Sequence, residues 1–253
     1  MLLEIKDLTK NFGGLAAVSD FSMDVAEGEI VGLIGPNGAG KSTVFNLITG
    51  VLPATSGTIV FDGHDITKKL PDQVARLGIG RTFQLNPLFP DFTVLENVTS
   101  SFFLHPHSSL FHVFFNTRTY RKNEAFVEEK AREILGLVGL DKVVDELAKN
   151  LPHGHQKMLG VARALATKPR LLLLDEPLAG MNPGEIQDSL DAIRSMRANG
   201  ITVLIVEHNM QILTLCDRVV VISFGKKITE GLPEEVRANT EVISAYFGTD
   251  YVC

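Results

Sequence analysis

The stretch GPNGAGKST, Gly35–Thr43, decides the fold of this chain. It matches the pattern G-x-x-x-x-G-K-[ST], with Gly35, Gly40, Lys41 and Ser42 at the fixed positions. The apolar run EIVGLIG leads into it, and the helical pattern KSTVFNLITG follows from it. A strand, a glycine-rich loop and a helix in this order form a cradle for phosphate groups.

The residue types of this loop each have a physical reason. Glycine lets the backbone curl so that successive N–H groups face one anion, and the helix N-terminus adds partial positive charge. We expect Lys41 to reach the β- and γ-phosphates of a nucleotide and Ser42 to ligate Mg²⁺. The other members of the cradle are Pro36, Asn37, Gly38, Ala39 and Thr43.

Two acidic residues close a second apolar run, LLLLDEP. A short run of this kind is typical of a parallel strand buried on both faces. Asp175 would stand at the sheet edge where nucleotides bind, and we expect it to hold Mg²⁺ directly or through water. Glu176 can orient or deprotonate the attacking water, a role that contributes about 10²–10⁴-fold in rate. The sequence therefore predicts binding and hydrolysis of ATP or GTP.

Composition narrows the choice of protein class. The 253 residues, 45% hydrophobic and 21% charged, are enough to bury a core in one large domain or two small ones. A net charge of −6 argues against a nucleic-acid binder. Two cysteines, Cys216 and Cys253, without a CxxC pair indicate a reducing compartment rather than a metal site. The chain shows neither a signal peptide nor about 18 successive apolar residues, so we expect a soluble cytoplasmic protein.

The order of apolar patterns predicts the architecture. Early strands are expected at Leu3–Leu8 and Val18–Val25, and SGTIVFDG reads as another strand. After a helical stretch, strands and helices alternate, with a helix starting at Pro183 and a buried strand at ITVLIVEH. This alternation predicts an α/β fold with a doubly wound parallel sheet, interrupted by a helical insert at roughly 88–165.

The order of the motifs resembles the nucleotide-binding domain of ABC transporters over essentially the whole chain. The motifs are the phosphate loop, the helical insert, LPHGHQ, ARAL, LLLLDEP and VEH. The resemblance implies a P-loop NTPase with a RecA-like, mostly parallel sheet, an N-terminal antiparallel β part and an inserted α-helical subdomain. It implies a single domain, 1–253, with a catalytic core at about 1–87 and 166–253 and the helical subdomain at about 88–165.

The segment LPHGHQ departs from the signature Leu-Ser-Gly-Gly-Gln of that family. In the family, two subunits sandwich two ATP molecules, and the signature helix of one subunit points at the nucleotide of the other. The residues implied in such contacts are Leu151, His153, Gly154 and His155. Pro152 replaces the serine and offers neither a hydroxyl nor an N–H. Either histidine supplies the missing donor, or both are surface residues at a helix cap.

Four other positions match family motifs one at a time. Phe12 stands where the family places an aromatic against adenine, the alternative being a core phenylalanine. Gln84, in GIGRTFQ, matches the residue that contacts Mg²⁺ and water. His208, in LIVEHNM, matches the residue that contacts the γ-phosphate, the alternative being a capping or core histidine. Asn182 stands where aspartate is usual, and can hydrogen-bond without carrying charge.

Longer stretches resemble the LivG-type ATPases of branched-chain amino-acid importers. They are FGGLAAVSDFSM, NGAGKSTVFNLITG, GIGRTFQLNPLFPDFTVLENV and DEPLAGMNP. The resemblance implies two transmembrane permease subunits, a second ABC ATPase subunit, identical or related, and indirectly an extracytoplasmic solute-binding protein. It implies a peripheral location on the cytoplasmic face of the inner or plasma membrane. Related ATPases serve urea or short amides, and no residue of an ATPase subunit touches the cargo.

Three other kinds of protein carry similar motifs. A soluble ABC ATPase could act as a scaffold in cofactor assembly. A nucleic-acid-linked ABC ATPase would carry two nucleotide domains or coiled-coil arms, whereas this chain has one phosphate loop and no heptad run. A nucleotide-binding regulator would not need Glu176 and His208.

The aromatic stretch SFFLHPHSSLFHVFF, from Ser101, lies in the helical insert, where the family docks its membrane subunits. We expect most of its phenylalanines to form the core of the insert. Phe111, Phe114 and Phe115 are the candidates for contact with a membrane partner.

Overall fold

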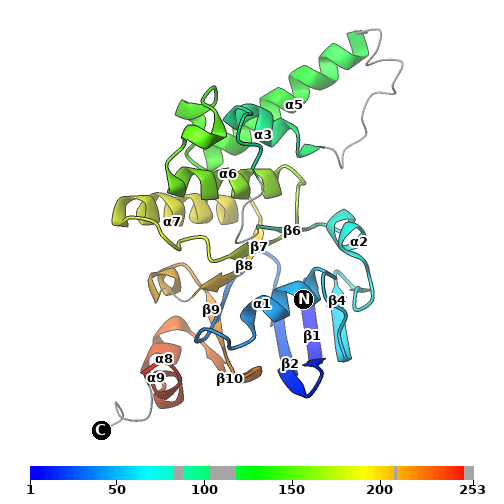
Figure 1. Ribbon diagram of the computed structural model, residues 1–253, viewed down its shortest axis with the longest axis vertical. Coiled ribbons are helices and arrows are strands. Elements are labelled where there is room, and N and C mark those ends of the chain that lie inside the picture. Colours follow the sequence, from blue (N-terminus) through cyan, green and yellow to red (C-terminus); the bar gives the residue numbers. More distant parts are fainter. Residues whose placement is uncertain (83–87, 103–117, 208–209, 248–253) are drawn as a thin grey trace.

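Two β-sheets and a layer of helices make up the protein (Figure 1). The computed structural model describes residues 1–82, 88–102, 118–207 and 210–247. The candidate residues Gln84, His208, Phe111, Phe114 and Phe115 lie outside these ranges.

The first sheet is antiparallel and comes from the N-terminal part of the chain. In sheet order its strands are β2 (Leu15–Val25), β1 (Leu3–Phe12), β4 (Ser56–Phe61) and β5 (His64–Asp65). The sequence predicted β1 and β2 correctly but too short. Both strands extend further because they close a hairpin in which Phe12 pairs with Leu15, and Gly13 turns the chain with φ 58°.

The second sheet is mostly parallel and lies at the centre of the molecule. In sheet order its strands are β10 (Lys226–Gly231), β9 (Arg218–Ser223), β3 (Ile30–Ile34), β8 (Thr202–Glu207), β7 (Leu171–Asp175) and β6 (Ile79–Arg81). All neighbours pair in parallel except β10, which runs antiparallel to β9. The predicted fold class, an α/β protein with a mostly parallel sheet, is confirmed.

The parallel strands are buried on both faces. In β3, Ile30 and Ile34 belong to one hydrophobic cluster, while Val31 and Leu33 belong to another. Alternate residues of a strand point to opposite faces, so each run of apolar residues supplies two cores at once. Full burial of each such side chain stabilises the fold by about 1.5–3 kcal/mol. This is the physical reason for the continuous apolar runs in the sequence.

The described residues also form helices, some packed on the parallel sheet and others beyond it (Figure 1). They are α1 (Lys41–Ile48), α2 (Pro71–Arg76), α3 (Val94–Thr99), α5 (Arg118–Leu137), α6 (His153–Leu165), α7 (Pro183–Ala198), α8 (Pro233–Ala238) and α9 (Thr240–Phe247), with short 3₁₀ turns η2 (Asp141–Val143), η3 (Ala148–Asn150) and η4 (Met210–Thr214). Helices α3, α5 and α6 lie at the end of the molecule opposite the antiparallel sheet (Figure 1). Among the described residues, no helix is both long enough and apolar enough to cross a membrane.

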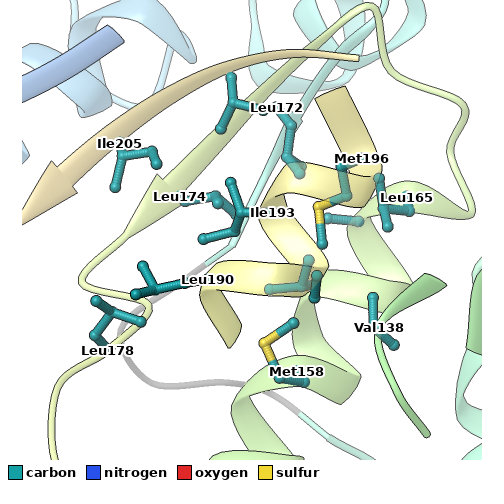
Figure 2. Packing of buried hydrophobic residues seen from close by; sticks show 14 of the residues in the cluster. Val138, Met158, Leu165, Leu172, Leu174, Leu178, Leu190, Ile193, Met196 and Ile205 are labelled. Carbon is teal, nitrogen blue, oxygen red and sulfur yellow. The ribbon is translucent and has the colours of Figure 1, made fainter. Parts of the chain in front are cut away.

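Helices α6 and α7 pack onto the sheet beside the strand that carries the acidic pair. Figure 2 shows Leu172 and Leu174 of β7 facing Ile193 and Met196 of α7, with Met158 of α6 nearby. Ala131 and Leu135 of α5 are fully buried in the same cluster. One face of β7 is therefore packed against α6 and α7.

Candidate nucleotide-binding site

The phosphate loop connects the end of β3 to the start of α1. Two of its glycines are required by geometry. Gly40 has φ 109°, and a Cβ placed on it would lie 2.7 Å from the carbonyl oxygen of Ala17. A Cβ on Gly35 would lie 2.0 Å from the carbonyl oxygen of Ile222. The loop can therefore approach β2 and β9 only because these positions lack a side chain.

Lys41 is the first residue of α1, and its side chain folds back over the loop. It is 5% exposed, and its Nζ donates to the carbonyl oxygens of Gly35 at 2.7 Å and Pro36 at 2.9 Å. Burial lowers the pKa of Lys41, while carboxylates at the ends of β7 and β8 raise it. The ammonium group of Lys41 thus lies against the backbone of the loop Gly35–Thr43, which the sequence predicted as a phosphate cradle.

A cavity of about 430 Å³ opens at this loop. Its lining is Leu15–Ala17, Asn37–Thr43, Glu176, Phe224 and Gly225. The structure therefore brings Glu176 to the phosphate loop, although it lies 133 positions after Thr43 in the chain. Phe12 does not line this cavity; it is 47% exposed and lies under Lys10, whose Nζ is 5.1 Å from the ring centre.

Phe224 lines the cavity but was not predicted from the sequence. It occupies the turn between β9 and β10, has φ 45° and is 91% exposed. A single phenylalanine before a glycine carries no motif that would have revealed it.

Asp175 ends β7 and is bound by a buried arginine. Its Oδ2 accepts from Nη2 of Arg81 at 2.9 Å, and the two side chains are 7% and 8% exposed. The other guanidinium nitrogen, Nη1, donates to Asn46 at 2.7 Å and Thr49 at 3.1 Å, both on or next to α1. The backbone N–H of Asp175 donates to the hydroxyl of Thr82 at 3.0 Å. Arg81 was not predicted from the sequence, because no local pattern indicates that it would pair with Asp175.

Glu176 adopts a left-handed backbone conformation, with φ 47°. This region costs a residue other than glycine about 1–2 kcal/mol. The N–H of Glu176 donates to the carbonyl of Val206 at 2.9 Å, and its own carbonyl accepts from Nζ of Lys157 at 2.8 Å. The strand thus turns sharply at Glu176, and the side chain lines the cavity at the phosphate loop.

Glu207, at the end of β8, supports the same turn. It is fully buried, and its Oε1 accepts from the backbone N–H of Leu178 at 2.8 Å. Such a carboxylate holds its acceptor position rigidly, because a charged hydrogen bond in a buried site is stronger than a neutral one.

The signature-like segment begins α6, away from the cavity. Pro152 is the N-cap residue, and Leu151 is buried beneath it. A Cβ on Gly154 would lie 2.7 Å from the carboxylate carbon of Glu185, so the helix start packs closely on α7. None of these residues lines the cavity at the chain's own phosphate loop.

The two histidines of this segment differ in exposure. His153 is exposed, and a Cβ placed on Gly180 would lie 3.4 Å from its Nε2. His155 is partly buried, and within the described part of the chain its Nδ1 has no hydrogen-bond partner. The structure therefore separates two residues that the sequence left equivalent.

Asn182 has a structural role at the start of a helix. It is the N-cap of α7, and its Oδ1 accepts from the N–H groups of Gly184 at 2.9 Å and Glu185 at 3.1 Å. The carboxylate of Glu185 accepts in return from the N–H of Asn182 at 2.9 Å, which completes a capping box.

The donor set near the loop suits a magnesium ion that travels with a nucleotide. No group of three or more His, Cys, Asp or Glu side chains that could hold a metal occurs in the described residues. Asp175 offers one buried carboxylate, and Ser42 offers a hydroxyl in the cavity lining. Mg²⁺ commonly takes one or two protein oxygens and completes its shell with phosphates and water.

Comparison with known proteins agrees with this geometry. The family model described as ABC transporter matches residues 18–179, and that of the branched-chain amino acid ATP-binding cassette transporter matches residues 226–252. The chain is 40% identical to the high-affinity branched-chain amino acid transport ATP-binding protein BraF of Pseudomonas aeruginosa, over 98% of both chains. It is 38% identical to the LivG protein of Escherichia coli, again over 98% of both chains.

Solved structures match over nearly the whole length as well. A nucleotide-free ATP-binding cassette from an ABC transporter superposes with a TM-score of 0.83 at 36% identity, over 98% of this chain and 99% of the other. An ATP-binding cassette in its ADP conformation gives a TM-score of 0.84 at 36% identity, over 98% of both chains. The resemblance inferred from the order of motifs is confirmed, and the chain belongs to the ABC transporter family of ATP-binding proteins.

Proposed function

We propose that this chain binds and hydrolyses ATP and thereby powers an importer of branched-chain amino acids. The observation that carries the proposal is a single cavity in which the phosphate loop and Glu176 face the same space. The close relatives named above, BraF and LivG, support branched-chain amino acids as the cargo.

The phosphates of ATP would lie in the loop Gly35–Thr43. The backbone N–H groups and Lys41 would bind them, because the loop glycines and the helix N-terminus present donors and partial positive charge. Phe12 would contact adenine at the rim of the site. Glu176 would orient the attacking water. Gln84 and His208 keep the roles that the resemblance implies, as predictions.

Mg²⁺ would be held by Asp175 and Ser42 together with phosphate oxygens. When bound, it would neutralise charge that develops on the transferred phosphoryl group. Asp175 is now paired with Arg81, so its buried charge is compensated without the ion.

A second ATPase subunit, identical or related, would complete the site. The start of α6, with Leu151, His153, Gly154 and His155, would face the nucleotide bound by the partner subunit. The exposure of His153, and the absence of the segment from the lining of the chain's own cavity, support this arrangement. Closure of the two subunits would favour one conformation of the membrane subunits through differential binding.

Two permease subunits would bind the ATPase at the cytoplasmic face of the membrane, and a solute-binding protein would deliver the cargo outside. The predicted helical subdomain, about 88–165, and the core, about 1–87 and 166–253, remain a proposal about how the chain divides. The importer of a urea or short-amide substrate is the alternative within the same group.

The enzymatic part is tested with the purified full chain. We expect Mg²⁺-dependent hydrolysis of ATP by the wild type. We expect the Glu176→Gln variant to bind a fluorescent ATP analogue with unchanged affinity but to hydrolyse ATP at least about 100-fold more slowly. Lys41→Ala should lose binding, and Lys149→Ala, on the surface, should match the wild type. A wild-type chain that binds no ATP would overturn the proposal.

The transport part is tested in the native host. The Glu176→Gln chain is expressed, membranes are isolated with ATP and Mg²⁺, and co-purifying proteins are identified. Two polytopic subunits and a solute-binding protein that binds leucine, isoleucine or valine would support the importer. A binding protein specific for urea or an amide would instead identify that compound as the cargo. Recovery only from the soluble fraction would refute the transport function and leave a scaffold ATPase.

A further inference from the structure

We propose that Lys157 is a positioning residue that fixes the backbone of Glu176 and links it to the start of α6. The inference rests on the proposed function, in which Glu176 orients the attacking water and the start of α6 faces the nucleotide of a second subunit. Lys157 itself touches no predicted phosphate or metal site, because it does not line the cavity at the phosphate loop.

The first support is the contact itself. Nζ of Lys157 donates to the carbonyl oxygen of Glu176 at 2.8 Å. A charged donor makes a stronger hydrogen bond than a neutral one, particularly where water is partly excluded. The same carbonyl also accepts from the backbone N–H of Ala179, at the longer distance of 3.3 Å. Of these two donors, Lys157 is the closer to the carbonyl oxygen of Glu176.

The second support is the conformation that this contact holds. Glu176 has φ 47°, in a region that residues other than glycine adopt only when their surroundings impose it. On its N-terminal side the position is fixed by the ladder bond to Val206. On its C-terminal side the bond from Lys157 fixes the carbonyl. The direction of the Glu176 side chain follows from these two anchors.

The third support is charge. Lys157 is partly buried, and burial lowers its pKa, while Glu207, Glu176 and Asp175 raise it, in that order. An ammonium group is kept in such a place when it has carboxylates to balance it. The same three carboxylates raise the pKa of Lys41 in the phosphate loop, so two lysines are under the influence of the acidic groups at the ends of β7 and β8.

The fourth support connects the contact to α6 as a whole. Residues His153 and Lys157 are four apart and so share one face of the helix. His153 lies against Gly180, and Lys157 lies against Glu176. One face of α6 thus contacts the loop that follows β7 at two places. A shift of α6 on binding the partner's nucleotide would be transmitted to the backbone of Glu176.

The test uses the full chain and five variants. Lys157→Met removes the donor and keeps the length and helix propensity, and Lys157→Arg restores a long cationic donor. Lys130→Met is the matched control, since Lys130 lies on the surface of α5 and pairs with Glu133. The fourth variant is Glu176→Gln, and the fifth combines it with Lys157→Met. Rates, KM for ATP, affinity for a fluorescent ATP analogue and thermal unfolding are measured for each.

We expect Lys157→Met to lower kcat by about 10–100-fold, because a displacement near 1 Å at a reacting group costs that much. KM and ATP affinity should stay within about twofold, because the phosphate loop is untouched. Lys157→Arg should recover much of the rate. In the Glu176→Gln background the Lys157→Met change should have no further effect, which a merely structural role would not produce.

Two results would overturn the inference while leaving the proposed function intact. One is an active wild type with a Lys157→Met variant of equal kcat. The other is a loss of rate that is as large in the Glu176→Gln background, or that comes with lost ATP affinity and early unfolding which Lys157→Arg does not correct. Failure of the wild type to bind ATP would instead overturn the proposed function, and this inference with it.

Discussion

Arg81 on β6 and Asp175 at the end of β7 form a buried ion pair, with Nη2 and Oδ2 2.9 Å apart. The two strands are parallel neighbours, and Arg81 pairs in register with Leu173. The long side chain of Arg81 extends beyond Leu173 and thus reaches the carboxylate of Asp175, two residues further along β7. The pair compensates a buried negative charge at the place where we propose that Mg²⁺ binds.

Removal of Arg81 should destabilise the fold. The Arg81→Met change would leave the Asp175 carboxylate buried without its cation, and breaking a buried pair on one side costs about 3–5 kcal/mol. It would also remove the donors to Asn46 and Thr49. Urea unfolding followed by circular dichroism measures the loss.

The matched control is Arg170→Met. Arg170 pairs with Glu27 and Asp62, but these side chains are 43% to 68% exposed. Exposed ion pairs contribute little, because water already solvates both charges. Equal losses of unfolding free energy in the two variants would show that burial does not make the Arg81–Asp175 pair more stabilising than an exposed pair.

Two glycine positions should respond to alanine in opposite ways. A Cβ on Gly35 would meet the carbonyl oxygen of Ile222 at 2.0 Å, so Gly35→Ala must displace β9 or the loop. Gly136 lies in α5 with nothing within 4 Å of the added Cβ, and there alanine should stabilise the fold by about 0.5–1 kcal/mol. Thermal unfolding and ATP binding distinguish them. A Gly35→Ala chain that binds ATP normally would contradict the geometry.

The parts of the fold that the sequence predicted are those encoded locally. The strands β7 and β8 appear as apolar runs because both faces are covered, and the phosphate loop has its own pattern. By contrast, β6 is three residues long, IGR, with a glycine at its centre. It becomes a strand only because Leu171–Leu173 pairs with it. No local signal encodes such a partner.

The same limit applies to the candidate site. Lys41, Ser42 and Glu176 follow from motifs that a single stretch carries. Arg81 and Lys157 were missed, because each acts on a residue that the fold brings near from elsewhere in the chain. Contacts of this kind depend on the tertiary approach of elements, and neither spacing nor residue type announces them.

We expect Asn182 to stabilise the fold by capping α7, whether or not the residue at this position carries a charge. Its Oδ1 accepts from two N–H groups at the start of α7, and losing such a cap costs about 1 kcal/mol. We expect Asn182→Ala to lower the melting temperature by about 2–4 °C in a chain of this size. Asn182→Asp should keep it, since aspartate caps equally well. A similar fall in both variants would indicate that the amide nitrogen matters instead.

Cys216 should be unreactive in the folded protein. It is buried, and burial raises the pKa of its thiol from 9.0 to about 12. At pH 8 it is therefore almost wholly protonated, whereas the thiolate is the reactive form. In a Cys253→Ser background, a thiol-specific disulfide reagent should label the chain only in urea. Rapid labelling without urea would contradict the burial.

The raised pKa of Cys216 also determines whether the free energy of unfolding rises or falls with pH. The unfolded chain loses the Cys216 proton near pH 9, and the folded chain only near pH 12. Between these values the unfolded state binds fewer protons, so the free energy of unfolding falls as pH rises. The contribution is complete below pH 9. Replacement by alanine should flatten this part of the stability profile, and an unchanged slope would exclude Cys216 as its source.

His153 should be the donor that compensates for Pro152, rather than His155. The side chain of His153 is exposed at the start of α6, whereas Nδ1 of His155 is buried. Only an exposed donor can reach a phosphate held by another subunit. A hydrogen bond to a charged group contributes about 1.5–3 kcal/mol, so His153→Ala should slow ATP hydrolysis about 10–100-fold. His155→Ala should change the rate much less, and His153→Gln should restore part of it, because glutamine keeps a donor.

Steady-state hydrolysis at saturating ATP, with thermal unfolding as a check on folding, measures all three variants. Unchanged rates in both alanine variants would mean that neither histidine replaces the missing hydroxyl, and that the backbone N–H groups of α6 suffice.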